Sequence, residues 1–272
     1  MSFGILAVLN RVETAPAVLA AAASLAGRIP GARLDLLHVR HDVMEDFLAS
    51  EEVMTRARRQ ELEAISEGRS AALRQIVARW HGMPAASLRE ITGRTAAIIV
   101  AESAGAALVV VGRAAPLHYE DARQAIHAAL LETGRPMLLV PASPAPSAQL
   151  GRHVAVAWKP DAPAERLLTA ALPILRAAER VSILIAEETG APPPPPHFLL
   201  DELDRAGVPH AVLRWAAAAQ EVGPGLLREA HAAGADMLAL GAYSRSRLLE
   251  RIFGGATQHM LDAADLPVLM MH

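Results

Sequence analysis

The amino-acid sequence predicts an α/β protein made of two tandem doubly wound domains, each with a five-stranded parallel sheet. Two observations predict this class. Short aliphatic runs alternate along the chain with longer amphipathic segments, and the whole alternation occurs twice in the same order. Continuous aliphatic strands are typical of parallel sheets that helices cover on both faces. Strands that alternate with helices in this way are joined by right-handed crossovers.

The repeat is visible as three pairs of matching blocks. Each copy opens with an apolar run and an Ala/Leu-rich segment, continues to a strand bounded by glycines, and ends on a strand that follows a proline. The pairs are Ile5–Leu9 with Val154–Trp158, Gly105–Gly112 with Gly234–Gly241, and Pro136–Val140 with Pro267–Met271. Three matching blocks in one order indicate an internal duplication.

In the first copy, the aliphatic runs predict strands near 4–10, 33–39, 87–91, 107–112 and 136–141. Helices are predicted near 13–28, 45–81, 94–104 and 120–133. The longest of these segments carries an apolar stripe at helical spacing, which we expect to face the core rather than a partner protein. The stripe consists of Leu62, Ile65, Ala72, Ile76 and Trp80.

In the second copy, strands are predicted near 152–158, 180–186, 209–215, 236–241 and 267–271, and helices near 162–178, 197–206, 219–233 and 255–264. A proline run at 192–196 favours the extended polyproline conformation. We expect a stiff surface spacer there, and recruitment of a proline-recognising module is the alternative. The predicted domains are residues 1–142 and 151–272, joined by a linker at 143–150 whose composition is rich in Pro, Ala and Ser.

Composition excludes several classes of protein. The chain has 272 residues, enough for two domains, and 52% of them are hydrophobic, which predicts a folded protein. A net charge of −3 without a basic patch argues against nucleic acid as a partner. The absence of cysteine removes disulfides and thiolate chemistry. We see neither a signal peptide nor a membrane-spanning segment, and expect a soluble, cytoplasmic protein.

Lysine usage excludes a P-loop nucleotide hydrolase. Lys159 is the only lysine in the chain. A Walker-type loop needs a Gly-Lys-Ser/Thr step because the lysine reaches the phosphates. Lys159 follows Trp158 and precedes Pro160, so that step does not occur.

The loop after the fourth strand of the second copy has the chemistry of an anion site. In open parallel sheets, ligands lie beyond the carboxyl ends of the strands at the point where strand order reverses. Gly241 would permit a tight exit from the strand, and Gly254 and Gly255 would open a helix whose free N–H groups suit an anion. Nearby hydroxyl groups and arginines, which include Ser244, Arg245 and Thr257, would add polar contacts. The alternative is that the glycines only turn the chain and the hydroxyl groups cap the helix.

This block resembles the signature of the universal stress protein family, which reads Gly, two residues, Gly, nine residues, then Gly followed by Ser or Thr. The tandem strand and helix order and the terminal Pro267–Met271 strand also resemble that family. The resemblance implies an adenine nucleotide α-hydrolase-like fold. In ATP-binding members the glycine loop holds the phosphates and ribose, and an Asp at the end of the first strand contacts the adenine side.

The second copy departs from this signature at three places. Ser244 stands where the second glycine belongs, Gly255 stands where Ser or Thr belongs, and Lys159 occupies the position of the Asp. The sequence there resembles a Gly-Gly-x-Thr variant of the family's tandem members. The residues that the resemblance implies for nucleotide binding are Val156, Trp158, Gly241, Ser244, Arg245, Gly254, Gly255 and Thr257.

The first copy is predicted to have lost nucleotide binding. Asn10 takes the place of the Asp, which is a conservative change. Its loop, however, keeps only the first glycine, Gly112, and places Pro116, Glu120 and Asp121 where phosphate would lie.

No set of residues indicates catalysis or a resident metal. His38, His41 and Asp42 cluster after a strand, but a third separated ligand group is missing from the pattern. No nucleophile, base and oxyanion donor form a recognisable set. We therefore expect no enzyme, and no metal beyond the Mg²⁺ that a nucleotide carries.

The leading hypothesis is a cytoplasmic stress-response protein that acts as a binding or regulatory module, with ATP or another adenine nucleotide as the possible ligand of the second domain. The alternatives are a nucleotide-free structural or interaction protein and a weak ATP hydrolase. Family members usually dimerise through the last strand, so Pro136–Val140 and Pro267–Met271 are candidate partners in an intramolecular pseudo-dimer. A further homodimer is possible, and neither nucleic acid nor a membrane is expected as a partner.

Overall fold

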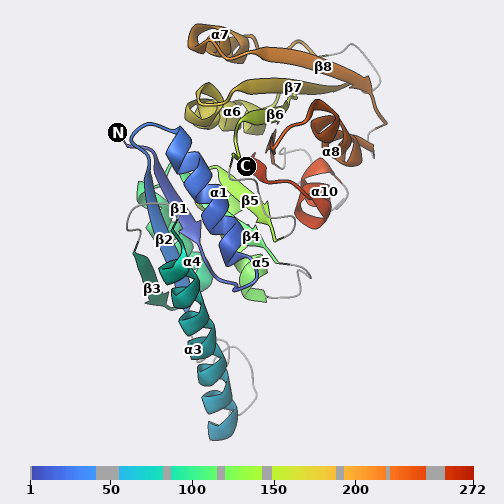
Figure 1. The fold of residues 1–272 in the computed structure, drawn as a ribbon. Coiled ribbons are helices and arrows are strands. Elements are labelled where there is room, and N and C mark those ends of the chain that lie inside the picture. Colours follow the sequence, from blue (N-terminus) through green and yellow to red (C-terminus); the bar gives the residue numbers. More distant parts are fainter. Residues whose placement is uncertain are drawn as a thin grey trace.

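A computed structural model describes residues 2–40, 55–81, 87–114, 120–142, 149–187, 193–218, 221–242 and 255–272. Over these residues the strands form one sheet of ten, in the order β3-β2-β1-β4-β5-β10-β9-β6-β7-β8 (Figure 1). We call residues 2–142 the first half and residues 149–272 the second half. Each half is a doubly wound unit with five parallel strands, as the sequence predicts.

The predicted strands lie within two residues of the observed ones at each end. The first half contains β1 (Gly4–Val8), α1 (Ala15–Arg28), β2 (Arg33–Arg40), α3 (Arg56–Arg79), β3 (Leu88–Thr92), α4 (Thr95–Glu102), η1 (Ser103–Gly105), β4 (Leu108–Arg113), α5 (Glu120–His127), η2 (Ala128–Glu132) and β5 (Met137–Pro141). The second half contains β6 (His153–Ala157), α6 (Ala162–Arg176), β7 (Arg180–Glu187), α7 (His197–Ala206), β8 (His210–Ala216), α8 (Val222–Ala233), β9 (Met237–Gly241), α10 (Ala256–Ala263) and β10 (Val268–Met271).

Local chemistry sets several helix ends in the second half. The side chain of Asp161 accepts a hydrogen bond of 3.0 Å from the backbone N–H of Ala164 and so caps the start of α6. Gly207 and Gly234 end α7 and α8 in the left-handed conformation, where a residue with a Cβ would be strained. These ends point α6 and α8 back across the sheet.

The sheet is the middle layer of three, and its strands alternate their side chains between two cores. In β1, Ile5 and Ala7 face one core and Leu6 and Val8 face the other, and all four are buried. Helices α1, α3, α6 and α7 cover the first face, and α4, α5, α8 and α10 cover the second. Each core contains residues from both halves, so the two halves share their hydrophobic interior.

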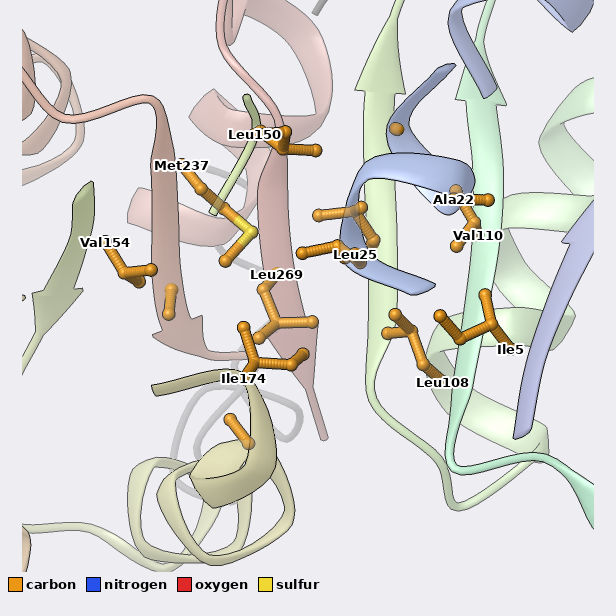
Figure 2. Packing of buried hydrophobic residues seen from close by; sticks show 14 of the residues in the cluster. Ile5, Ala22, Leu25, Leu108, Val110, Leu150, Val154, Ile174, Met237 and Leu269 are labelled. Carbon is orange, nitrogen blue, oxygen red and sulfur yellow. The ribbon is translucent and has the colours of Figure 1, made fainter. Parts of the chain in front are cut away.

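The halves meet where β5 and β10 pair antiparallel, with Val268 opposite Leu139 and Met270 opposite Met137. This pairing of the two proline-led strands confirms the predicted contact within one chain. Figure 2 shows Leu25 of α1 beside this junction, across from Leu269. We call the β5–β10 pair and the contacts across it the seam.

Polar contacts reinforce the seam at one end. The Ser24 hydroxyl donates to the Leu150 carbonyl at 3.0 Å, and the Arg28 guanidinium donates to the Ala177 carbonyl at 3.1 Å. Arg28 also lies 3.4 Å from the carboxylate of Glu179. Leu150 is itself buried in the shared core. Residues 143–148 of the predicted linker lie outside the described part of the chain, and the domain boundaries stay a prediction.

The apolar stripe predicted for the long helix faces the core only at its C-terminal end. Ile76 and Trp80 pack against the first core, and Ser70 and Leu73 are the helix's buried residues. Ile65 is 52% exposed, because the N-terminal part of α3 projects beyond the sheet (Figure 1). The prediction that Ile65 faces the core is therefore wrong.

His38 ties β2 to its neighbours from a buried position. Its Nδ1 donates to the Leu9 carbonyl at 2.9 Å, and its Nε2 lies 3.0 Å from the Ser70 hydroxyl of α3. Burial lowers the pKa of the imidazole below its ordinary value of 6.5, because the charged form loses its hydration there.

We predict different effects for truncating Leu269 and Ile65. Leu269 is fully buried at the seam, so Leu269→Ala should lower the free energy of unfolding by about 2–5 kcal/mol through lost burial and a cavity. Ile65→Ala should change it by less than about 0.5 kcal/mol, because the side chain is exposed. Urea unfolding followed by circular dichroism measures both values. Equal losses in the two variants would contradict this assignment of the core.

A second prediction concerns pH. Below pH 6.5, His38 is protonated in the unfolded chain but to a smaller extent in the folded chain, because its pKa is lowered there. The free energy of unfolding therefore falls as the pH drops. Between about pH 7.5 and about pH 5.5, wild type should lose up to about 1.4 kcal/mol more stability than His38→Gln. Other groups that titrate, His153 among them, cancel in this comparison. Parallel pH dependences of the urea midpoint would show that His38 has no such role.

Candidate functional site

The candidate site of the second half lies at the carboxyl ends of β6 and β9. These neighbouring strands are where strand order reverses, because the chain leaves β6 for α6 on one face and leaves β9 toward α10 on the other. Such a point is where open α/β sheets place their ligands. The geometry of five predicted site residues can be described there, namely Val156, Trp158, Gly241, Gly255 and Thr257. Ser244, Arg245 and Gly254 lie outside the described residues.

Gly241 ends β9 against the start of α6. A Cβ at this position would lie 2.5 Å from the backbone nitrogen of Ala164 and 2.8 Å from the carbonyl carbon of Pro163. Its backbone is not in the left-handed region, so the glycine is required by close packing and not by the turn that the sequence suggested. Because the atoms it meets are backbone atoms, they have little freedom to move aside.

Gly112, which occupies the same position in the first half, is packed in a similar way. A Cβ there would lie 2.4 Å from the Cβ of Thr14, just before α1. The one glycine that both loops share is thus explained by the approach of a strand end to a helix start. Its retention in the first half does not indicate a ligand.

The start of α10 is chemically suited to an anion. Gly255 is the N-cap in extended conformation, with φ −95° and ψ 173°, and no side chain of the described residues caps this end. The first-turn N–H groups of a helix lack intrahelical acceptors and carry partial positive charge. No acidic residue stands in the first turn, and Thr257 is buried within it.

The two predicted site residues at the end of β6 are buried. Val156 is fully buried within β6. Trp158 is only 8% exposed, its backbone N–H donates to the Leu184 carbonyl at 2.9 Å, and its indole N–H donates to the Pro194 carbonyl at 2.8 Å. Lys159, which follows it, is exposed.

The described part of the proline run is held over the ends of these strands. The Pro194 carbonyl accepts from Trp158, and the Pro193 carbonyl accepts from the Arg214 guanidinium at 3.2 Å. Pro193–Pro196 precede α7 and are tied to the sheet by these two carbonyls, and the predicted role of the run as a stiff surface spacer stays a prediction.

A carboxylate lies near the equivalent strand end of the first half. Asp121 of α5 pairs with Arg11, which follows β1, and with Arg69 of α3 at 2.7 Å. Aligning Pro136 with Pro267 places Ala256 over Ala125, so α5 begins five residues earlier than α10 does. This additional helical turn carries Asp121. Its carboxylate pairs with the two guanidinium groups, which could otherwise bind a phosphate.

Asn10 lies beside this cluster in the sequence and is also buried. Its Oδ1 accepts from the Val39 backbone N–H at 3.2 Å, and its Nδ2 has no partner among the described residues. The amide therefore braces β1 against β2. These contacts support the prediction that the first half has lost nucleotide binding, which itself stays a prediction.

The histidine cluster does not form a metal site in the described structure. Both ring nitrogens of His38 lie within hydrogen-bond distance of Leu9 and Ser70, and His41 and Asp42 lie outside the described residues. Across the described ranges no group of three or more His, Asp or Glu side chains is placed to hold a metal ion. Across the same ranges, the helices are too short or too polar to cross a bilayer.

We predict that Gly241→Ala destabilises the fold even without a ligand. Its Cβ would meet backbone of α6, and such overpacking costs about 1–3 kcal/mol. Gly207→Ala is a control, because a Cβ at Gly207 would meet open space. Its loss, about 1 kcal/mol, comes only from the left-handed backbone. Urea unfolding of both variants without nucleotide decides between packing and ligand contact. If Gly241→Ala is as stable as wild type, close packing does not explain this glycine and contact with a ligand does.

Comparison with known structures supports the fold. A universal stress protein from Archaeoglobus fulgidus superposes with a TM-score of 0.69 at 15% sequence identity, over 98% of this chain and 95% of that chain. A functionally unknown protein from Pseudomonas aeruginosa superposes with a TM-score of 0.50 at 15% identity, over 98% of this chain and 92% of that chain. At such identities the likeness concerns the fold alone.

Comparison of sequences identifies the family. None of the curated proteins compared with the chain matches its sequence significantly. The sequence profile described as "Universal stress protein family" matches residues 122–272, which is more than half of the chain and includes all of the second half. The chain belongs to the universal stress protein family.

Proposed function

We propose that this universal stress protein is a non-enzymatic binding or regulatory module of the cytoplasm that binds an adenine nucleotide in its second half. The observation that carries the proposal is the start of α10. Its first-turn N–H groups, for which the described residues provide no side-chain cap, lie after the strand end where this fold places ligands. Phosphates would be bound by these groups, with the buried Thr257 close to them in the first turn.

The asymmetry of the two halves supports one nucleotide per chain. In the second half the helix opens with Gly255, Ala256 and Thr257, and no acidic side chain is present in the first turn. In the first half the earlier start of α5 brings the carboxylate of Asp121 to Arg11 and Arg69. A phosphate group in the first half would have to displace Asp121 from both arginines, so binding is expected only in the second half.

The contacts of Trp158 favour a second candidate, a nucleotide-free interaction protein. Its indole N–H is already used by the Pro194 carbonyl, and its ring is buried in the core. Adenine therefore could not lie at the position of this ring unless the proline segment moved. If the base side stays closed, phosphates alone would be recognised, or no small ligand at all.

Isothermal titration of the chain with ATP, ADP and AMP, and with inorganic triphosphate, tests both candidates. We predict that ATP releases heat with a stoichiometry of one and that Gly255→Asp weakens binding at least tenfold, about 1.4 kcal/mol, by charge repulsion. Aspartate is a favourable N-cap, so the helix should be retained. Gly255→Asn has nearly the same shape without the charge and should bind nearly as wild type does.

The outcomes separate the candidates. Equal weakening in the Asp and Asn variants would show a steric effect and contradict an anion site at Gly255. Heat from triphosphate that equals the heat from ATP would show that the base is not recognised. No heat from any of these compounds would reject the nucleotide and leave the interaction protein as the function.

A further inference from the structure

Arg113 of the first half caps a helix of the second half. It ends β4, directly after Gly112, and its guanidinium extends across the seam. Its Nη1 donates to the Asp262 carbonyl at 2.9 Å and its Nη2 donates to the Ala264 carbonyl at 2.5 Å. These carbonyls belong to the C-terminal end of α10, where a helix has unsatisfied acceptors and partial negative charge.

This contact is made by a partly desolvated charge. The Nε of Arg113 is buried and has no partner among the described residues. The pKa of the guanidinium lies below its ordinary value, because burial outweighs the attraction of Asp262 and Asp265. An arginine that only solubilised the surface would keep its hydration. The geometry instead uses both terminal nitrogens on the carbonyls of one helix end.

The duplicated fold does not provide a matching contact from the same position in the other half. Gly241 corresponds to Gly112, and the residue after Gly241 is Ala242, which is fully buried and has only a methyl side chain. At this position, therefore, the half with the degenerate loop holds a helix of the half with the glycine loop, and the reverse contact cannot form.

The capped helix is the one that begins at the candidate anion site. Helix α10 has eight residues and spans about 12 Å, so it moves as one short rod. Its C-terminal end is fixed by Arg113, and its N-terminal end presents Gly255 and Thr257. Fixing one end restricts where the N–H groups at the other end can lie.

We propose that Arg113 is a positioning residue for the second half's site, through which the first half sets the orientation of α10. The inference rests on the proposed function where it concerns ligand affinity. It also has a consequence that does not need a ligand, because a loosened α10 should expose its own amides. The strand end at which the degenerate loop of the first half begins thus has a role in the site of the second half.

The test compares Arg113→Ala, Arg113→Lys and Arg135→Ala. Arg135 is the matched control, because its guanidinium also donates to a carbonyl, that of Ala104 at 3.0 Å, but within the first half. We predict that Arg113→Ala weakens ATP binding about fivefold or more, that Arg113→Lys recovers part of the loss, and that Arg135→Ala binds as wild type does.

Hydrogen exchange without ligand supplies the second readout. The His259 N–H bonds to the Gly255 carbonyl at 3.2 Å, in the first turn of α10 and three residues before Asp262, whose carbonyl Arg113 contacts. A residue that only closed the C-terminal end would change exchange there and leave His259 unchanged. A positioning role predicts faster exchange of the His259 amide in Arg113→Ala and not in Arg135→Ala.

The two readouts separate the inference from the proposed function. If wild type binds ATP and Arg113→Ala binds it equally well, the inference is overturned and the proposed function stands. If wild type binds no nucleotide, the proposed function fails, and exchange at His259 alone decides: faster exchange supports the positioning role and unchanged exchange overturns it.

Discussion

The antiparallel pairing of β5 with β10 is the contact on which the rest of the molecule depends. It joins two parallel five-stranded units into one sheet and gives each of the two cores residues from both halves. Neither β5 nor β10 is then an exposed edge, which an isolated half would have to protect. The pairing also turns the halves so that the end of β4 meets the end of α10. The contact of Arg113 with α10 therefore follows from the pairing of β5 with β10.

Within this frame the two halves have come to differ in chemistry while keeping one backbone plan. Gly112 and Gly241 are both held by close approach to a helix start, so the shared glycine reports packing. The difference lies in the helix that follows. In the first half α5 starts early and brings Asp121 to two arginines, whereas in the second half α10 starts at a glycine with no acidic residue in its first turn. In the second arrangement no first-turn carboxylate offsets the partial positive charge of the helix start.

Sequence patterns predicted the strands and the duplication, because aliphatic runs and matching blocks can be read from the sequence alone. The seam was predicted from the resemblance to a family whose members pair through the last strand. Sequence patterns could not show how far α3 extends beyond the sheet, so Ile65 was placed in the core although it is exposed. They also could not assign the contacts of Trp158 and Arg113, which join residues 36 and about 150 positions apart. The reason for Gly241 was missed likewise, because a close approach is a property of the fold. Of the predicted site residues, Ser244, Arg245 and Gly254 stay predictions.

The claim that the seam makes both halves one folding unit is tested most directly by unfolding each half under its own probe. The three tryptophans allow this, since Trp80 belongs to the first half and Trp158 and Trp215 belong to the second. Two variants would each contain a single tryptophan. Trp158→Phe combined with Trp215→Phe keeps Trp80, and Trp158→Phe combined with Trp80→Phe keeps Trp215. Urea unfolding followed by fluorescence should give coincident midpoints in each variant by its tryptophan and by circular dichroism, as a single cooperative transition requires. A tryptophan transition that separates from the circular dichroism transition would show that the halves unfold independently.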